Sequence, residues 1–407
     1  MRKTLTVILL GLLSWTLGAQ TDSLRLGYLV RGKVRDAGSG KALESVHVSA
    51  AGRHHATVTN ADGEFVLKSD APIGTVEFSF LGYRKRVEKA TSAYMQVGLQ
   101  REALPLKEAS IITGEPADIV RAALEKADVS YCQEPELLEC FYRETVQKRN
   151  RYTYVAEAVA RIFKDRYDRN IGSRDAAALE KSRLVVSQRK QDTLSVKTQG
   201  GPNMAITCDF LKNRELLFTE EEMALYSFSM DSPTYIGDRV QFVIKMEPSP
   251  YAQVDYALYF ATLYIDRETL SFTRIETSLD MRDQVKAIRA ILVSKPLGLR
   301  FFPKEASIVL NYRTVGEKTR LEYFRSTIRF DCDWRKRLFK THYTAINELV
   351  VTDVYPTATP IPRRERFRTK DYLDDKALEF EDPDFWADYN IIEPSESLEH
   401  AIGRLRK

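Results

Sequence analysis

Short runs in which apolar and polar residues alternate fill residues 26–112 of the chain. Successive side chains of a strand point to opposite faces, so each run predicts one half-buried β-strand. Turn residues separate the runs, as at Asn60–Gly63, where Asn, Asp and Gly tolerate positive φ. The positions predicted to face inward are Val46, Val48, Phe65, Leu67, Val76, Phe78, Phe80, Met95, Val97 and Leu99. About seven strands at this spacing predict a sandwich of two small sheets.

From residue 117 to 407 the alternating runs are longer, and helical patterns lie between them. Apolar residues at helical spacing after Pro116 predict a helix, and a similar stripe after Pro394 predicts a C-terminal one. The runs that predict strands are 139–146, 152–163, 240–246, 256–265, 270–279, 306–312, 321–330 and 343–354. We therefore predict a mainly β fold: an N-terminal seven-stranded β-sandwich followed by a larger antiparallel β-sheet domain with a few helices.

Three segments of the larger domain carry more local signals. Residues 284–293 suit a helix by apolar spacing and a strand by their β-branched content, and both interpretations stay open. A short helix is predicted at 205–212. Thr219 and Glu222 form a capping box, in which the hydroxyl and the carboxylate satisfy free N–H groups at a helix start.

The first 19 residues have the pattern of a signal peptide. Arg2 and Lys3 precede a short apolar stretch at 7–13, and Ala19 is a small residue at the expected cleavage point. We expect the mature chain to begin at Gln20. An uncleaved membrane anchor is the alternative, but the apolar stretch is too short to span a bilayer comfortably. The pattern predicts an exported protein.

Five short motifs lie within residues 26–112. They are Gly32-x-Val34, Asp36 with Gly38, Ala42-Leu43-x-x-Val46, Thr59-Asn60-x-Asp62-Gly63-x-Phe65 and Phe80-Leu81-Gly82-Tyr83. Together they resemble the carboxypeptidase-regulatory-like domain. The resemblance implies a transthyretin-like sandwich, common in exported Bacteroidetes proteins and at the N-terminus of their TonB-dependent receptors. It implies a periplasmic or outer-membrane-associated location. It does not imply peptidase activity, because this module lies outside the catalytic unit of carboxypeptidases.

Two further stretches bear a resemblance. Residues 385–398, FWADYNIIEPSESL, resemble the C-terminal stretch of Bacteroidetes proteins that carry the same first domain. The hairpin at 263–280, LYIDRETLSFTRIETSLD, resembles the strand–turn–strand of LolA-like lipoprotein carriers. This second likeness implies that a strongly curved sheet would shelter a lipid or a lipid-modified protein on its apolar concave face.

The net charge of +4 on 407 residues is too small for a nucleic-acid partner, which needs a concentrated basic face. Basic residues do cluster in two places, at 335–337 and at 363–370. They are either solvated loops or contacts with lipid phosphates at a membrane face. The expected peripheral membrane contact uses Arg363, Arg364, Arg366 and Arg368.

The four cysteines have no metal-site spacing. Cys132, Cys140, Cys208 and Cys332 could form two disulfides in an oxidising compartment, with three pairings, or remain buried thiols. Both states stay open at the level of the sequence.

Candidate chemistry is sparse, and we predict no catalytic, cofactor-binding or metal residue. The adjacent pair His54–His55 has no carboxylate at zinc-carboxypeptidase spacing. The D-x-D at Asp331–Asp333 has no accompanying nucleotide-binding pattern, and Asn60 with Asp62 is explained by turn chemistry. The chain contains no H-E-x-x-H, G-x-S-x-G, P-loop or G-x-G-x-x-G motif.

These observations favour a non-enzymatic binding or interaction protein of the cell envelope. The sandwich would be a docking module, and the larger sheet would present the surface for a protein, lipid or glycan partner. The alternatives are a glycan- or peptide-acting hydrolase with an unrecognised site and a carbohydrate-binding module. The hydrolase stays open because folding can bring distant carboxylates together.

Overall fold

The computed structural model describes most of the chain after the first 27 residues. The described parts are 28–91, 94–102, 114–168, 173–189, 192, 194, 196–316, 318–334, 339–379, 386 and 389–405. The predicted signal peptide and the basic cluster at 335–337 lie outside them. No helix in these parts combines the length and the hydrophobicity of a membrane span.

The N-terminal region is a sandwich of two small sheets, as the sequence predicts. Strand order is β4-β1-β7 in one sheet and β3-β2-β5-β6 in the other. The strands are β1 (Tyr28–Asp36), β2 (His47–Ala50), β3 (Ala56–Val58), β4 (Glu64–Ser69), β5 (Thr75–Ser79), β6 (Arg86–Lys89) and β7 (Met95–Leu99). Apolar residues from both sheets form the core between them, and the rings of Phe65 and Phe78 meet edge to face at 5.4 Å.

The turn before β4 follows from its residues. The Asn60 side-chain oxygen accepts hydrogen bonds from the backbone N–H groups of Asp62 and Glu64, both at 2.9 Å. Gly63 has φ +76°, and a Cβ there would lie 2.4 Å from the Val34 carbonyl oxygen. Only glycine fits this position, because it has both the conformational freedom and the small size.

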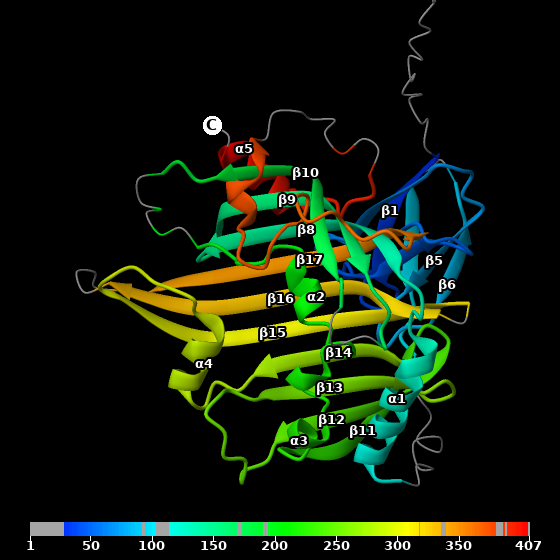
Figure 1. Ribbon diagram of the computed structural model, residues 1–407. Coiled ribbons are helices and arrows are strands. Elements are labelled where there is room, and N and C mark those ends of the chain that lie inside the picture. The colour runs from blue at the N-terminus through cyan, green and yellow to red at the C-terminus, as the bar shows by residue number, and fades with distance from the viewer. Residues whose placement is uncertain are drawn as a thin grey trace, which may run out of the picture.

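The larger domain is built on one eleven-stranded sheet (Figure 1). Its order is β11-β12-β13-β14-β15-β16-β17-β8-β9-β10-β18. Neighbours pair antiparallel except β18, which adds parallel to β10. The strands are β8 (Glu136–Lys148), β9 (Arg151–Lys164), β10 (Ala176–Val186), β11 (Tyr226–Ile236), β12 (Arg239–Pro248), β13 (Tyr259–Asp266), β14 (Phe272–Leu279), β15 (Leu299–Val315), β16 (Lys318–Trp334), β17 (Thr341–Pro356) and β18 (Leu378–Glu379).

The two faces of this sheet have different coverings. The inner face carries the main core, which includes Tyr142, Phe324 and Leu349, and α1, α2 and α4 pack on it (Figure 1). The outer face presents Phe141, Val350 and their neighbours to the sandwich and the C-terminal segment. The helical elements are α1 (Pro116–Ser130), α2 (Asn203–Thr207), η1 (Arg214–Leu216), α3 (Glu220–Met223), α4 (Gln284–Ile291), η2 (Leu373–Asp375) and α5 (Glu396–Leu405).

Trp386 and the segment at 389–394 fasten the sandwich to the outer face. The Asn390 side chain exchanges two hydrogen bonds with the Lys68 backbone, at 2.7 and 2.9 Å. The Lys68 ammonium donates to the Trp386 and Tyr389 carbonyl oxygens at 2.8 and 2.9 Å. The Thr57 hydroxyl donates to a carbonyl of the same segment at 2.8 Å. The sandwich therefore packs directly on the sheet and leaves the inner face to the helices.

Three strands of the large sheet were not predicted, namely β10, β11 and the two-residue β18, and burial explains the first two. In β11, most side chains are half-buried or exposed, because the strand forms one edge of the sheet and lacks a clear alternation. In β10, Ala176–Ala178 are all buried, because the strand is covered on both faces and gives no period of two. The residue pattern was uninformative in both strands for these opposite reasons.

The structure decides the segments that the sequence left open. Residues 284–291 form the helix α4, and Asp283 caps it by accepting from the N–H groups of Val285 and Lys286. The predicted helix at 205–212 is wrong in its bounds, since α2 ends at Thr207.

The capping box at Thr219 forms only in part. The Thr219 hydroxyl accepts from the Glu222 N–H at 3.2 Å, as predicted, but the Glu222 carboxylate accepts from the Tyr256 hydroxyl at 2.6 Å.

All four cysteines are free thiols. Cys132, Cys140 and Cys332 are buried, and Cys208 is half-buried. Of the two states left open by the sequence, the structure therefore has the buried thiols, and none of the three disulfide pairings forms.

Candidate functional site: an apolar cavity on the inner face

Every second side chain of the neighbouring strands β15, β16 and β17 points to the inner face, and together these side chains form one apolar wall. On β16, residues 326, 328, 330 and 332 point to the inner face, because side chains two apart share a face. The Phe330 ring lies 4.9 Å from the Phe301 ring of β15 and stacks 5.4 Å from the Tyr343 ring of β17. These aromatic contacts hold the wall in a fixed shape.

Helix α4 and the segment at 194–199 form the opposite wall. Ala287 is fully buried, and Ile288 and Ile291 pack against the core, so the apolar stripe of α4 faces the sheet. Met204 of α2 and Tyr372 complete the lining. These covering segments come from parts of the chain far apart in sequence.

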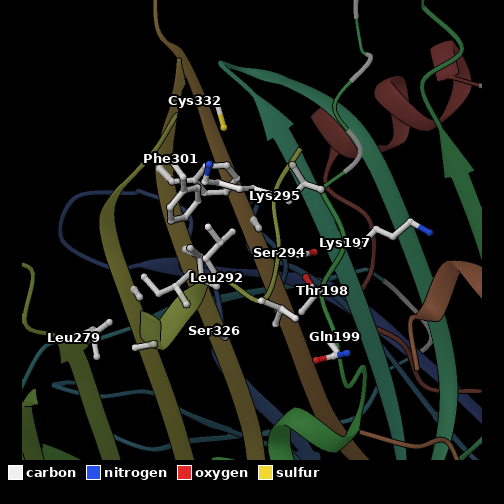
Figure 2. A pocket seen from close by; sticks show the side chains of 18 of the residues that line it. Lys197, Thr198, Gln199, Leu279, Leu292, Ser294, Lys295, Phe301, Ser326 and Cys332 are labelled. Atoms are coloured by element: carbon white, nitrogen blue, oxygen red, sulfur yellow. The ribbon is translucent and has the colours of Figure 1, made fainter. Parts of the chain in front are cut away.

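Between the two walls lies a cavity of about 620 Å³ (Figure 2). Most of its lining is apolar. The apolar and aromatic side chains around it include Leu194, Val196, Met204, Tyr259, Leu279, Ile291, Leu292, Val293, Leu299, Phe301, Ile308, Ile328, Phe330, Ala345 and Tyr372. A volume of roughly 300–1,000 Å³ is typical of sites for small molecules and cofactors.

Polar side chains are a minority of the lining. Figure 2 shows Ser326 and Gln199 toward one end of the cavity, Lys295, Phe301 and Cys332 toward the other, and Thr198 and Ser294 between them. Asn347 of β17 pairs in register with Ser326 and points to the same face.

The amide of Asn347 is the most unusual of these groups. The residue is 1% exposed, and neither its oxygen nor its nitrogen has a hydrogen-bond partner in the described part of the chain. A buried polar group without a partner costs about 1–3 kcal/mol, so such a group calls for an explanation. Beside an apolar cavity, an unpaired amide can serve a polar atom of a ligand.

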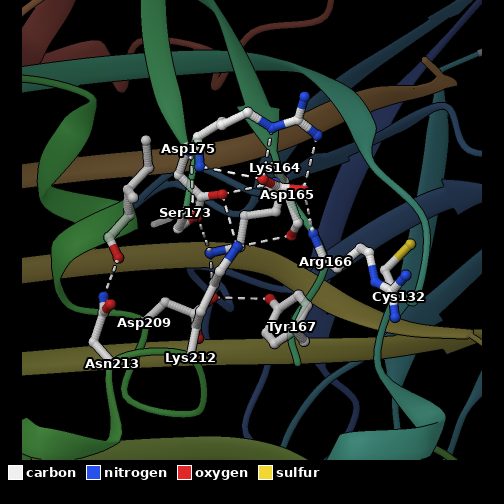
Figure 3. A network of polar contacts seen from close by, with 12 residues as sticks. Cys132, Lys164, Asp165, Arg166, Tyr167, Ser173, Asp175, Asp209, Lys212 and Asn213 are labelled. Atoms are coloured by element: carbon white, nitrogen blue, oxygen red, sulfur yellow. Dashed lines mark hydrogen bonds and ion pairs between the residues drawn. The ribbon is translucent and has the colours of Figure 1, made fainter. Parts of the chain in front are cut away.

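A buried network of charges anchors the segment that follows α2 (Figure 3). The Asp209 carboxylate is fully buried and accepts from the Lys164 ammonium at 2.6 Å and from the Tyr167 and Tyr312 hydroxyls at 2.8 and 2.7 Å. Burial lowers the pKa of Lys164, but the neighbouring carboxylates outweigh it and raise the pKa above its ordinary value. The network joins β9 and β15 to the covering segment that carries Met204.

Both aspartates of the D-x-D motif lie on the face of β16 that points away from the cavity, because residues two apart share a face. Cys332 points into the cavity, whereas Asp331 pairs with His342 and Asp333 with Arg300. Burial and the Asp331 charge raise the pKa of the Cys332 thiol to about 11. The thiol is therefore protonated at neutral pH and is a poor nucleophile.

His54 and His55 lie at the junction of the sandwich with the sheet. The two ring nitrogens of His55 lie 3.2 Å from Asp70 and 3.2 Å from Asp353, and the hydrogen bond to Asp353 raises its pKa. Burial lowers the pKa of His54, whose ring faces Arg320. No group of three metal-ligating side chains occurs in the described ranges.

The basic stretch at 363–370 contributes no residue to the cavity lining, although the Lys370 carbonyl oxygen accepts from the lining residue Gln199 at 3.3 Å. Arg363, Arg364 and Arg368 are exposed, and Arg366 is half-buried with its guanidinium on the Ile361 carbonyl oxygen at 2.9 Å. The structure does not test the expected membrane contact of these arginines, which stays a prediction.

A second, polar cleft of about 510 Å³ lies between the sandwich and the sheet. Three of its carboxylates are paired: Glu322 with Arg313 at 3.2 Å, Asp266 with Arg239 at 3.2 Å and Glu77 with a lysine at 3.0 Å. Burial raises the pKa of Glu322, but His47 and Arg313 outweigh it, so the net shift is downward. A carboxylate held ionised in this way is unsuited to act as a general acid.

The N-terminal sandwich has a family match. Residues 30–110 match the CarboxypepD_reg-like domain. This match confirms the domain type predicted from the five motifs, over about the predicted range. The rest of the chain, including the cavity, lies beyond the match. No curated protein matches the chain.

Solved structures show only slight similarity. A DUF1329 family protein from Desulfovibrio piger ATCC 29098 is 7% identical, covers 60% of this chain and 95% of its own, and has a TM-score of 0.25. MucB in complex with MucA(peri) is 12% identical, with coverage of 60% and 100% and a TM-score of 0.17. A protein of unknown function from Bacteroides fragilis NCTC 9343, described as membrane-associated, is 10% identical, with coverage of 81% and 98% and a TM-score of 0.15. Similarities this low define neither the fold nor the function.

Proposed function

We propose that this protein is a non-enzymatic binding protein of the cell envelope. Its larger sheet would hold an amphipathic lipid in the cavity under α4, and its sandwich would be a docking module for an envelope protein. The observation that carries the proposal is the largely apolar cavity of about 620 Å³ on the inner face, which is open at one end. The envelope location rests on the signal-peptide pattern of residues 1–19 and on the type of the first domain.

The distribution of apolar and polar groups favours an acyl chain with a polar end. Ile308, Ile328 and Phe330 offer apolar contact along the cavity, and each buried CH₂ contributes about 0.8 kcal/mol. Ser326 lines the cavity, and the unpaired Asn347 amide lies beside it on β17, behind the lining. A purely apolar ligand would leave Asn347 unsatisfied, whereas a hydroxyl, carboxyl or ester group would pair with it.

The lining chemistry supports binding over hydrolysis. The side chains that line the cavity include no Asp, Glu or His, which are the usual groups for general acid–base catalysis. A glycosidase needs two carboxyl groups across its cleft, and in the second cleft Glu77, Asp266 and Glu322 are held in ion pairs. We therefore favour the binding role over the hydrolase alternative.

Filling the cavity is expected to abolish lipid binding. Ile328→Trp places a larger ring in the middle of the inner wall, and we expect the affinity for the fluorescent fatty acid cis-parinaric acid to fall at least about tenfold, because several buried methylenes lose their contacts. Fluorescence titration of the purified mature protein measures the change.

The matched control is Arg329→Trp. Arg329 is the next residue of β16 and projects from the opposite face, where its side chain is 59% exposed. This variant should bind cis-parinaric acid like the wild type. Equal binding by Ile328→Trp and the wild type, or no binding by the wild type, would contradict the proposal. Competition by soluble glycans instead of lipids would favour the carbohydrate-binding alternative.

A second substitution separates stability from binding. Asn347→Leu is expected to raise the free energy of unfolding by about 1–3 kcal/mol, because it removes an unpaired buried amide. The same change should weaken binding of a fatty acid, whose carboxyl group loses its partner. Urea unfolding and the fluorescence titration measure the two effects, and a variant that is less stable yet binds normally would argue against a ligand-facing amide.

A further inference from the structure

The cavity opens at one end of the sheet. Val293, Ser294, Lys295 and Pro296 line the cavity and are also exposed to solvent. They belong to the loop between α4 and β15. The loop lies at the end of the sheet where β16 ends and β17 begins, at the left in Figure 1. The register agrees, because Leu299 pairs with Trp334 and Cys332 pairs with Thr341.

Large apolar side chains are exposed around this opening. Val293 is 71% exposed, Leu297 102% and Phe339 77%. Only one other large apolar residue in the described parts, Tyr251, exceeds 70%. Leu297 lies two residues before β15 and Phe339 two residues before β17, so both are at the same end of the sheet. Single exposed apolar residues are ordinary, but a group around a cavity opening indicates a surface that is covered in function.

Positive charge accompanies these apolar side chains. The Lys295 ammonium donates to the Leu299 carbonyl oxygen at 2.6 Å, and the Lys340 ammonium lies 4.0 Å from the centre of the Phe302 ring. Neither lysine forms an ion pair with a carboxylate of the described residues. We call Val293, Leu297, Phe339, Lys295 and Lys340 the mouth rim.

We propose that the mouth rim docks on the surface of an anionic lipid bilayer, so that lipid enters the cavity directly from the membrane. The inference rests on the proposed lipid site and adds the surface from which that site is loaded. The exposed apolar side chains would insert at the level of the headgroups, and the two lysines would face the lipid phosphates. An apolar protein partner would explain Leu297 and Phe339. It would not explain the neighbouring lysines, whose charges no carboxylate of the described residues neutralises.

The two kinds of side chain make separable contributions. Apolar insertion stabilises the bound state in proportion to the buried area and depends little on salt. A lysine near an anionic surface adds roughly 1 kcal/mol, and this attraction is screened over a Debye length. Binding should therefore require both phosphatidylglycerol in the bilayer and the apolar rim, and it should weaken as the salt concentration rises.

The test is co-sedimentation of the full mature chain with vesicles of phosphatidylcholine alone or mixed with phosphatidylglycerol. The wild type is expected to bind the mixed vesicles preferentially. Leu297→Glu/Phe339→Glu should lower this binding at least about tenfold. Lys295→Gln/Lys340→Gln should lower it about tenfold for the mixed vesicles and little for the neutral ones.

The control is Val129→Glu. Val129 is an exposed residue near the end of α1, where Tyr131 bridges to Thr319 at the opposite end of the β15–β16 hairpin. This variant should bind vesicles like the wild type. Loss of vesicle binding in Val129→Glu, or unchanged binding in Leu297→Glu/Phe339→Glu, would overturn the docking proposal.

A titration with cis-parinaric acid in solution distinguishes this proposal from the lipid site itself. Leu297→Glu/Phe339→Glu leaves the cavity intact, because neither residue lines it, and should bind the soluble fatty acid with wild-type affinity. If the wild type takes up the fatty acid but never binds vesicles, the cavity proposal stands and the docking proposal fails. If the wild type binds mixed vesicles but no fatty acid, the lipid site fails, and the rim is only a membrane contact.

Discussion

Asp209→Asn is expected to lower the free energy of unfolding by about 3–5 kcal/mol. The substitution keeps the shape of the side chain but removes the charge that faces the Lys164 ammonium at 2.6 Å. Lys164 is 5% exposed, so water cannot replace the lost partner. Breaking a buried ion pair from one side carries a penalty of this size, because it leaves an uncompensated charge in the protein interior.

The rest of the network does not compensate for the loss. Asp175 remains 3.4 Å from the Lys164 ammonium, but it also accepts from the buried Lys212 at 2.7 Å. The hydroxyls of Tyr167 and Tyr312 both donate to Asp209, and an amide can accept from both only through its single oxygen. The variant therefore leaves an excess of positive charge and a shortage of acceptors in one buried region.

Urea unfolding followed by tryptophan fluorescence measures the effect, because Trp334 and Trp386 both lie in the larger domain. The control is Asp231→Ala, which breaks an exposed pair with Lys245 and should cost less than about 1 kcal/mol. The double variant Asp209→Asn/Lys164→Met should be more stable than Asp209→Asn alone. Equal losses in Asp209→Asn and Asp231→Ala would show that the buried network does not stabilise the fold.

Glu144→Gln is expected to remove a stability penalty that the wild type acquires as the pH rises. Glu144 lies on the inner face of β8, is 1% exposed and accepts from the Tyr142 and Tyr154 hydroxyls at 2.8 and 3.2 Å. Burial raises the pKa of its carboxyl to about 7, although the two tyrosines partly oppose the shift. In the described part of the chain no cation pairs with this carboxylate.

The sign follows from proton binding in the two states. Between pH 4.5 and about 7, the unfolded chain has released the Glu144 proton while the folded chain still holds it. Stability therefore falls as the pH rises through this window and falls no further from this group above it. With 1.36 kcal/mol for each unit of pKa, the full penalty is about 3 kcal/mol.

Urea unfolding at pH 4.5 and pH 8 tests this expectation. The stability of Glu144→Gln relative to the wild type should increase by about 3 kcal/mol between the two pH values. Glu125→Gln, on the exposed face of α1, serves as the control for a lost carboxylate and should follow the wild type. A constant difference between Glu144→Gln and the wild type at both pH values would contradict a raised pKa.

Most of the local structure could be predicted from the residue pattern. The alternation at Phe65 and Leu67, the turn at Asn60–Gly63 and the helix after Pro116 all appear in the structure as expected. These signals are local, because a strand face, a tight turn and a helix stripe depend on neighbours in sequence. The edge strand β11 and the doubly covered strand β10 escaped prediction, since their burial depends on the rest of the fold.

The candidate site could not be predicted, because its wall residues read as ordinary core. Ile308 and Ile328 look like any alternating apolar positions, and nothing in the pattern indicates that an empty space lies above them. Of the two lysines at the cavity opening, Lys340 follows the basic stretch at 335–337 closely, whereas Lys295 is an isolated residue that no pattern marks. A weak signal was present in Asn347, a polar residue among inward-facing apolar ones.

The sequence by itself determined the class of the fold, the type of the first domain and the expectation of export. Each depends on composition, short motifs or periodicity, which are properties of residues close together in the chain. Tertiary structure decided that β17 pairs with β8, some 200 residues earlier, and that α4 and residues 194–199 cover one stretch of the inner face. Such long-range pairing depends on the free energy of the whole fold, and the cavity with its exposed rim exists only once that pairing is made.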